Sequence, residues 1–95
     1  MTSPTPTLPL KMTEITVYTT NWCAYCDRAK RLLQKRGLDY TEVNLDDDPA
    51  FRQHLLEISG RMTVPQIFIA GTPIGGFDEL RALDQSGELA ELTAA

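Results

Sequence analysis

The chain has two cysteines, and both lie in the segment Cys-Ala-Tyr-Cys at residues 23–26, where the sequence pattern changes. Residues 14–19 alternate apolar and polar side chains, which predicts a strand. Ala24 to Arg36 has helical periodicity and is followed by Gly37, so we expect a helix that begins at the cysteines. The first cysteine would then lie at the helix N-terminus, where unpaired N–H groups and the helix dipole stabilise a thiolate. Cys26 would lie one turn further on, within reach of a disulfide.

Two other uses of such a cysteine pair fit this sequence less well. Tetrahedral zinc needs four ligands, but His54 is the only histidine and there is no second pair of closely spaced cysteines. A structural disulfide usually serves a small secreted domain and closes a longer loop than residues 23–26. The spacing therefore favours a redox-active dithiol over both, and we predict no metal site of the ordinary kind.

The length of 95 residues predicts one domain, which we place at residues 13–95. Residues 1–12 are rich in Thr and Pro and are predicted to form a disordered tail. No apolar run has the length of a secretory signal or of a membrane span, so we expect no membrane partner. A reducing cytoplasm is the expected location, where a dithiol is more often catalytic than structural.

The net charge of −4 argues against a nucleic-acid partner, because phosphate binding needs clustered Lys and Arg. Basic residues nevertheless gather on the helix that follows the cysteines. We prefer to interpret them as a solvated helix face, with an anion-binding patch as the alternative. They are Arg28, Lys30, Arg31, Lys35 and Arg36.

The remaining segments predict two more strand and helix units. Residues 38–45 form an expected strand, and Asp48 and Pro49 are the expected N-cap and first residue of a second helix. Its periodicity predicts a core face and an end at Ser59-Gly60. Residues 66–70 and 72–74 predict a hairpin that turns at Gly71, and residues 77–83 with Leu89 and Leu92 predict helical structure. The core face of the second helix is expected to comprise Phe51, Leu55 and Ile58.

The predicted order is therefore β-α-β-α-β-β-α. The first two strands are joined by a helix and should be parallel with a right-handed crossover, whereas the last two form an antiparallel hairpin. The fold class is α/β, with a four-stranded mixed sheet and helices on both faces.

Three motifs resemble those of the dithiol glutaredoxins, small bacterial members of the thioredoxin superfamily. They are residues 23–26, then Thr63-Val64-Pro65, then Gly75-Gly76-Phe77-Asp78. The resemblance extends from about Glu14 to Leu92. It implies a thioredoxin fold and a monomeric, glutathione-dependent disulfide oxidoreductase that acts on protein disulfides and glutathionylated proteins. A thioredoxin-like donor fed by a flavoprotein reductase is a less favoured alternative.

The resemblance also implies a role for individual residues. Cys23 would be the nucleophile and Cys26 the resolving cysteine. Pro65 would be a cis proline that presents the backbone of Val64 to the cysteinyl part of glutathione, as an added strand would. The α-ammonium of glutathione would bind Asp78. The full set implied for glutathione comprises Tyr25, Arg52, Thr63, Val64, Pro65, Gly76, Phe77 and Asp78, with Arg52 assigned to the glycine carboxylate.

Two positions depart from the family pattern. Thr20 occupies a position that is usually lysine, so part of the positive field near the thiolate is missing, unless Lys11, Arg28 or Lys30 replaces it. Ala24 occupies a position that is often proline. In some glutaredoxins with a small residue there, the first cysteine and glutathione bind a [2Fe–2S] cluster between two protomers. Cluster binding through Cys23 in a dimer is therefore the alternative function.

Overall fold

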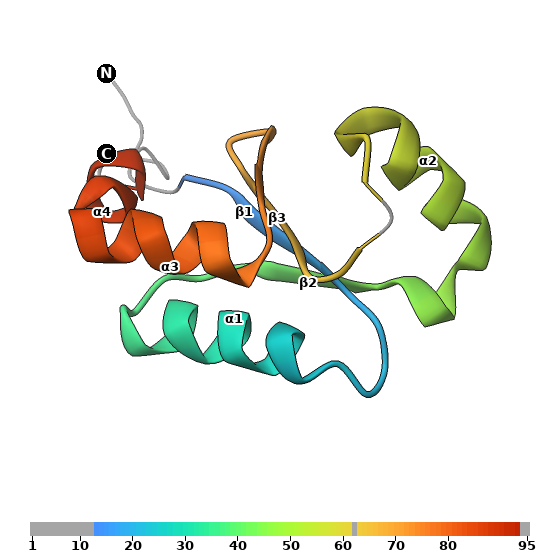
Figure 1. Cartoon of the computed structure of the whole chain (residues 1–95), viewed down its shortest axis with the longest axis horizontal. Helices are drawn as coiled ribbons and strands as arrows, with labels where there is room; N and C mark the ends of the chain where they lie inside the picture. Colours follow the sequence, from blue (N-terminus) through green and yellow to red (C-terminus); the bar gives the residue numbers. More distant parts are fainter. Residues whose placement is uncertain (1–12, 62, 94–95) are drawn as a thin grey trace, which may run out of the picture.

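The computed structural model describes residues 13–61 and 63–93, which contain four strands. These are β1 (Ile15–Thr19), β2 (Thr41–Asn44), β3 (Gln66–Ile69) and β4 (Thr72–Gly75), and they form one sheet in the order β2-β1-β3-β4. β1 is parallel to β2 and antiparallel to β3, and β3 is antiparallel to β4. The predicted mixed sheet is confirmed (Figure 1). The predicted tail at residues 1–12 lies outside the described residues.

The same described residues contain four α-helices: α1 (Ala24–Lys35), α2 (Pro49–Ser59), α3 (Phe77–Ser86) and α4 (Glu88–Thr93). α1, α3 and α4 cover one face of the sheet, and α2 lies apart from them against the other face (Figure 1). The helices on both faces were predicted from the order of elements. In the described part of the chain, no helix is long and apolar enough to cross a membrane.

The alternation of β1 explains how one strand serves two cores. Ile15 and Val17 point to the core under α1, α3 and α4, where both are buried. Tyr18 points to the smaller core under α2 and stacks on Phe51, with ring centroids 5.6 Å apart. Each fully buried aliphatic side chain contributes about 1.5–3 kcal/mol to the free energy of unfolding. The larger core contains Ile15, Val17, Ala29, Leu33, Ile67, Ile69, Leu80 and Leu89.

Two sequence predictions need correction. The strand predicted at residues 38–45 is confined to Thr41–Asn44. It ends there because Leu45 starts the 3₁₀ turn η1 (Leu45–Asp47), which the Asn44 side chain caps by accepting the Asp46 N–H at 2.9 Å. Ile58 is not a core residue: its side chain is 43% exposed, whereas Leu55 of the same helix is fully buried. α2 packs through a narrower face than its periodicity predicted. The predicted Asp48 cap is confirmed, since its side chain accepts the Phe51 N–H at 3.3 Å.

Candidate active site

Cys23 lies at the N-terminus of α1, as the sequence predicted. It is the N-cap residue, and its Sγ accepts the N–H of Cys26 at a distance of 3.1 Å. The two cysteines form a disulfide, with their Cα atoms 5.1 Å apart. Cys26 is buried, with 1% of its surface exposed, whereas Cys23 is partly exposed. A thiolate at Cys23 would keep the N–H of Cys26 as a charge-assisted donor, so this position favours the nucleophile.

The loop between β1 and α1 is anchored to the end of β2. The N–H of Asn21 donates to Asp46 Oδ2 at 2.7 Å, and Asn44 Nδ2 donates to Asn21 Oδ1 at 2.9 Å. Trp22 follows with φ of 60° and a fully exposed side chain. Positive φ is costly for a residue with a Cβ atom, so these anchors fix a strained connection that presents Cys23. The sequence did not indicate this role for Asp46, which belongs to a run of three aspartates.

The opposite wall of the site is the segment before β3. The Val64–Pro65 peptide bond is cis, as the resemblance implied, and the carbonyl oxygen of Val64 lies 4.0 Å from Cys23 Sγ. Gly76 lies close behind: a Cβ atom there would be 3.3 Å from the carbonyl oxygen of Pro65. The two motifs therefore meet beside the disulfide although they are distant in the sequence.

A cavity of about 230 Å³ lies between this wall and the start of α3. It brings together seven of the eight residues predicted for glutathione. Arg52 is the exception, because this α2 residue does not line the cavity. Arg61 and Glu79 line it and were not predicted. The seven residues are Tyr25, Thr63, Val64, Pro65, Gly76, Phe77 and Asp78.

Glu79 fixes the start of α3 at this cavity. Its Oε1 accepts the N–H of Gly76 at 2.8 Å, which is the half of a capping box that a glycine N-cap can form. This backbone hydrogen bond, with a smaller contribution from the charge of Arg61, lowers the pKa of the Glu79 carboxyl below its usual value. The pattern of a small N-cap residue followed three positions later by Glu was available in the sequence and would have predicted this contact.

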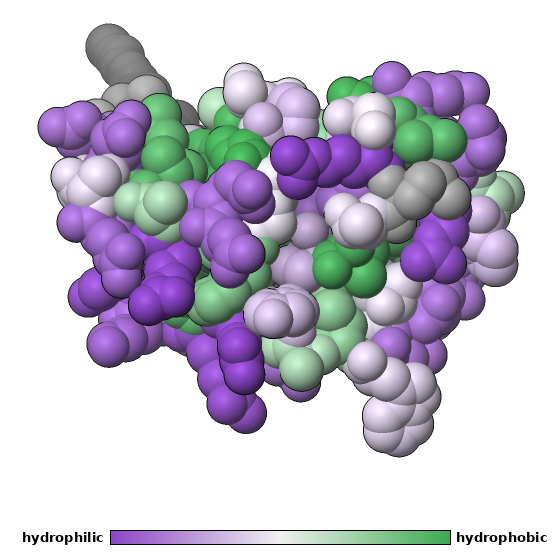
Figure 2. All heavy atoms as spheres, in the orientation of Figure 1, coloured by the Kyte–Doolittle hydropathy of each residue, from purple (hydrophilic) through white to green (hydrophobic). Residues whose placement is uncertain are grey.

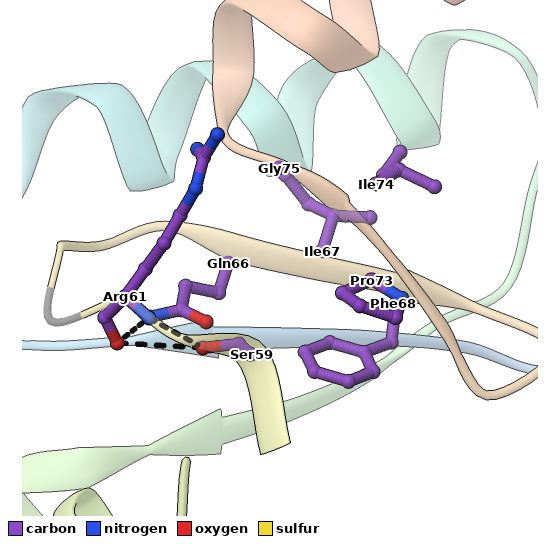
Figure 3. A pocket seen from close by; sticks show the side chains of 8 residues that line it. All are labelled: Ser59, Arg61, Gln66, Ile67, Phe68, Pro73, Ile74 and Gly75. Carbon is purple, nitrogen blue, oxygen red and sulfur yellow. Dashed lines mark hydrogen bonds between the residues drawn. The ribbon is translucent and has the colours of Figure 1, made fainter. Parts of the chain in front are cut away.

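Arg61 lines a second cavity of about 230 Å³ as well (Figure 3). Its N–H donates to Ser59 Oγ at 3.1 Å, and its carbonyl oxygen accepts Gln66 Nε2 at 2.8 Å. Figure 3 shows its side chain extending from this anchored backbone toward the chain near Gly75. The cation therefore lies beside the start of α3, where it can bind an anionic group.

Thr20 replaces a lysine that is usual in the family, and Lys30 and Arg28 were among the possible substitutes for its charge. The structure shows what each of these two cations contacts. Lys30 Nζ binds Glu42 Oε2 at 3.1 Å, and Thr19 donates to the same oxygen at 2.8 Å. Burial alone would raise the pKa of Glu42, but these two hydrogen bonds and the charge of Lys30 lower it overall. Lys30 is thus committed to Glu42. Arg28 stacks 5.2 Å from the ring centre of Tyr25, beside the cavity. Lys11 lies outside the described residues.

Comparison with known proteins agrees with this geometry. A sequence model of the glutaredoxin family matches residues 15–74. The chain belongs to the glutaredoxin family. This glutaredoxin is 46% identical over 84 residues to the glutaredoxin of Pseudomonas aeruginosa, a match covering 88% of this chain and 100% of the relative. It is 46% identical over 78 residues to glutaredoxin 3 of Escherichia coli K12, covering 82% of this chain and 94% of that one.

Solved glutaredoxin structures share the fold. The buckwheat glutaredoxin–glutathione complex superposes with a TM-score of 0.80 at 31% identity, covering 88% of this chain and 79% of the other. The solution structure of the glutaredoxin from Brucella melitensis gives a TM-score of 0.79 at 41% identity, covering 90% and 94% of the two chains. The thioredoxin fold predicted from the sequence is confirmed.

This glutaredoxin is an oxidoreductase with a redox-active cysteine pair. A thiolate at one cysteine attacks a sulfur of a substrate disulfide, forming a mixed disulfide and releasing the other substrate sulfur as a thiolate. The second cysteine then attacks the mixed disulfide, which releases the reduced substrate and leaves the Cys23–Cys26 disulfide seen here. The structure allows both steps without displacing α1, because the two cysteines are one helical turn apart.

Proposed function

We propose that this glutaredoxin uses glutathione to reduce protein disulfides and glutathionylated proteins. The observation that supports the proposal most is the cavity beside the disulfide, because it gathers seven residues from three separate motifs around one end of α3. A similar chain, the buckwheat glutaredoxin, was solved in complex with glutathione. We also propose the cytoplasm as its location, since reducing conditions there return the cysteine pair to its dithiol form.

Each part of glutathione has a complementary group in this cavity. The backbone N–H and C=O of Val64 would pair with the cysteinyl residue, which would place its sulfur near Cys23. The first N–H groups of α3, at Phe77 and Asp78, would bind the γ-glutamyl α-carboxylate, and the Asp78 side chain would bind the α-ammonium. The Gly76 N–H already donates to Glu79. Arg61 adds a cation that can bind a carboxylate. Arg52 would bind the glycine carboxylate if glutathione extends beyond the cavity toward α2.

The proposed cycle conserves thiols and disulfides at each step. With a glutathionylated protein, the Cys23 thiolate attacks the glutathione sulfur and the protein leaves as a thiolate. A second glutathione thiolate then attacks the Cys23–glutathione disulfide, which forms oxidised glutathione and regenerates Cys23. With a protein disulfide, Cys26 resolves the mixed disulfide, and two glutathione molecules reduce the resulting Cys23–Cys26 disulfide.

The deciding experiment couples turnover to one of two reductases. We expect NADPH oxidation when the enzyme, a glutathionylated peptide, glutathione and glutathione reductase are combined. We expect little oxidation when glutathione and its reductase are replaced by thioredoxin reductase. The opposite result would assign the chain to thioredoxin-like chemistry and reject glutathione as the co-substrate.

The [2Fe–2S] alternative has to be judged from the donors that this chain supplies. Such a cluster needs four ligands, usually thiolates. In the described part of the chain, no group of three or more His, Cys, Asp or Glu side chains could hold a metal ion. One chain therefore does not fit a cluster by itself, and two Cys23 thiolates with two glutathione thiols would be required. No contact in the structure favours that arrangement over the reductase function, so it stays a prediction.

A further inference from the structure

A third cavity, of about 340 Å³, lies between α1 and α3 on the face away from α2. We call it the α1–α3 groove. The residues that form its walls recur three or four positions apart along each helix, so they lie on one face of that helix. In Figure 2 the surface over these helices is largely hydrophilic. The groove is lined by Arg28, Arg31, Leu32, Lys35 and Arg36 of α1 and by Phe77, Arg81, Asp84 and Gln85 of α3.

The groove is positively charged, whereas the chain as a whole carries a net negative charge. Five of the lining residues are cations and one, Asp84, is an anion, although the chain has a net charge of −4. Arg36 is neutralised by Asp84 through two hydrogen bonds of 2.8 and 2.9 Å. Arg31, Lys35 and Arg81 are exposed and make no ion pair with other residues of the described ranges 13–61 and 63–93. The groove is therefore a local positive site with unused donors.

The groove adjoins the active site. Phe77 lines both the groove and the cavity beside the disulfide. Arg28 of the groove stacks on Tyr25, which lines that same cavity. A polypeptide bound covalently to Cys23 could therefore leave the active site over Tyr25 and Phe77 and continue between the helices. Leu32 and Phe77 give the groove an apolar floor for its side chains.

We propose that the α1–α3 groove binds an acidic segment of the protein substrate while its cysteine reacts with Cys23. This inference rests on the proposed function and adds a substrate class to it. From Arg28 to Arg36 the helix rises about 12 Å, which equals about four residues of extended peptide. From Cys23 to Arg28 it rises about 7.5 Å, or about two extended residues. The preferred substrates therefore have Asp or Glu at about the third to sixth positions from the reacting cysteine.

The test uses symmetric disulfides of one-cysteine peptides that differ only at those positions, so that attack by Cys23 always leaves one peptide bound to it. One peptide has four Glu residues there, on the C-terminal side of the cysteine, and another has them on the N-terminal side. A third has four Gln residues. Release of the peptide thiol is followed with glutathione, glutathione reductase and NADPH. We expect one of the Glu peptides to have a kcat/KM about fivefold above that of the Gln peptide, and the difference to disappear in high salt.

The double variant Arg31→Gln/Arg81→Gln should lose this preference and keep its activity on the Gln peptide. The matched control is Thr41→Glu/Thr72→Glu, in which two exposed sheet residues outside both cavities are changed. Both double variants lower the net charge equally, because each substitution removes one positive charge or adds one negative charge. A preference that survives in the groove variant, or disappears equally in the control, overturns the proposal.

Failure of the proposed function is distinguished by two further measurements. If the unmodified protein does not reduce 2-hydroxyethyl disulfide with glutathione, the proposed function is rejected. This result does not depend on the groove, because the substrate has no peptide segment. Binding of a cysteine-free, fluorescently labelled Glu peptide to the unmodified protein tests the groove without turnover. We expect saturable binding that the Arg31→Gln/Arg81→Gln variant weakens. Absence of binding, or tighter binding of a single-stranded oligonucleotide at the same site, would overturn the proposal.

Discussion

The two cysteines differ in exposure and in the role that follows from it. Cys23 is partly exposed and lies at the helix N-terminus, whereas Cys26 is buried behind it. Substrate sulfur can approach Cys23 directly, while Cys26 can reach only a sulfur already bound to Cys23. The exposure of each side chain therefore supports the roles predicted from the sequence.

Serine substitution should separate the two roles. Cys23→Ser should lose all activity, because the remaining thiol, Cys26, is buried. Cys26→Ser should retain deglutathionylation and lose reduction of protein disulfides, which requires a resolving thiol. Steady-state turnover of a glutathionylated peptide and of a disulfide-bonded protein checks this. An active Cys23→Ser variant, with Cys26→Ser inactive on both substrates, would reverse the assignment.

The glutathione site should depend on Asp78 and Arg61. Asp78→Ala and Arg61→Ala should each lower kcat/KM for the glutathione mixed disulfide about tenfold, because each removes one partner of a charge-assisted contact. We expect the same decrease in kcat/KM for Arg52→Ala, although Arg52 does not line the cavity. Circular dichroism and thermal unfolding are the controls for an intact fold. If kcat/KM falls only in Asp78→Ala and Arg61→Ala, glutathione binds within the cavity and does not reach Arg52. Unchanged kinetics in all three variants would reject this site.

Among individual residues, the sequence predicted the site residues that belong to motifs and missed those that do not. Arg61 is a single arginine after a helix, and its place in the cavity depends on contacts with Ser59 and Gln66 that span the chain before β3. Asp46 belongs to an acidic run, where periodicity does not show which carboxylate binds the Asn21 N–H. Side-chain hydrogen bonds place both residues, with near neighbours for Arg61 and across 25 positions for Asp46, and a pattern along the chain does not contain them.

Among the elements, α3 begins with a backbone geometry that only glycine accepts easily. Gly75 has φ of 116°, and a Cβ atom there would lie 2.7 Å from Cγ of Glu79. Any side chain at this position would displace Glu79 and break its hydrogen bond with the Gly76 N–H. The start of α3 would then lose the cap that orients it toward the active site.

We therefore expect Gly75→Ala to be more damaging than Gly87→Ala. Both positions have positive φ, so each substitution should cost about 1–2 kcal/mol of unfolding free energy. Gly87 has open space around its Cα, so its variant should keep normal kinetics. Gly75→Ala should lose additional stability and also raise KM for glutathione. Urea unfolding and steady-state kinetics check this, and equal effects in both variants would show that the Glu79 cap does not matter.

The ion pair between Arg36 and Asp84 joins the end of α1 to α3. The two hydrogen bonds from Arg36, with its charge, hold the pKa of the Asp84 carboxyl below its usual value. A carboxyl whose pKa is lower when folded adds stability above its unfolded pKa, and this stability is lost as pH falls through the folded pKa.

Asp84→Asn should accordingly make the free energy of unfolding depend less on pH in the acidic range. At neutral pH the variant should be less stable than the unmodified chain, and the difference should shrink below the ordinary aspartate pKa of about 4. Urea unfolding at several pH values measures it. Asp39→Asn is the control, because Asp39 is exposed and makes no ion pair among the described residues. A difference that grows as pH falls would contradict the assignment.

The type and order of the elements were predictable, and their packed faces and lengths were less so. Periodicity correctly placed Leu55 in the core, but it could not show that Ile58, on the same helical face, stays 43% exposed. The end of β2 was missed because Asn44 caps a turn through its own side chain, which an alternating pattern does not reveal. These are effects of neighbouring structure on each element.

For the whole molecule, the open question is whether two chains associate around a cluster. Cluster binding predicts that anaerobic reconstitution with iron, sulfide and glutathione gives a coloured dimer. Ala24→Pro should then lower the cluster yield and leave reductase activity, and Cys23→Ser should abolish both. Visible absorbance and size-exclusion chromatography measure colour and size. A protein that stays colourless and monomeric, with Ala24→Pro behaving identically, would leave the reductase function alone.

Trp22 gives the molecule a built-in optical reporter. It is the only tryptophan of the chain, its side chain is fully exposed, and it directly precedes Cys23. The fluorescence of the protein at tryptophan wavelengths therefore comes from one point at the rim of the active site. We expect oxidation of the cysteines and arrival of a substrate to change the surroundings of this indole. Stopped-flow emission can thus follow each half of the catalytic cycle in an unlabelled, unmodified protein.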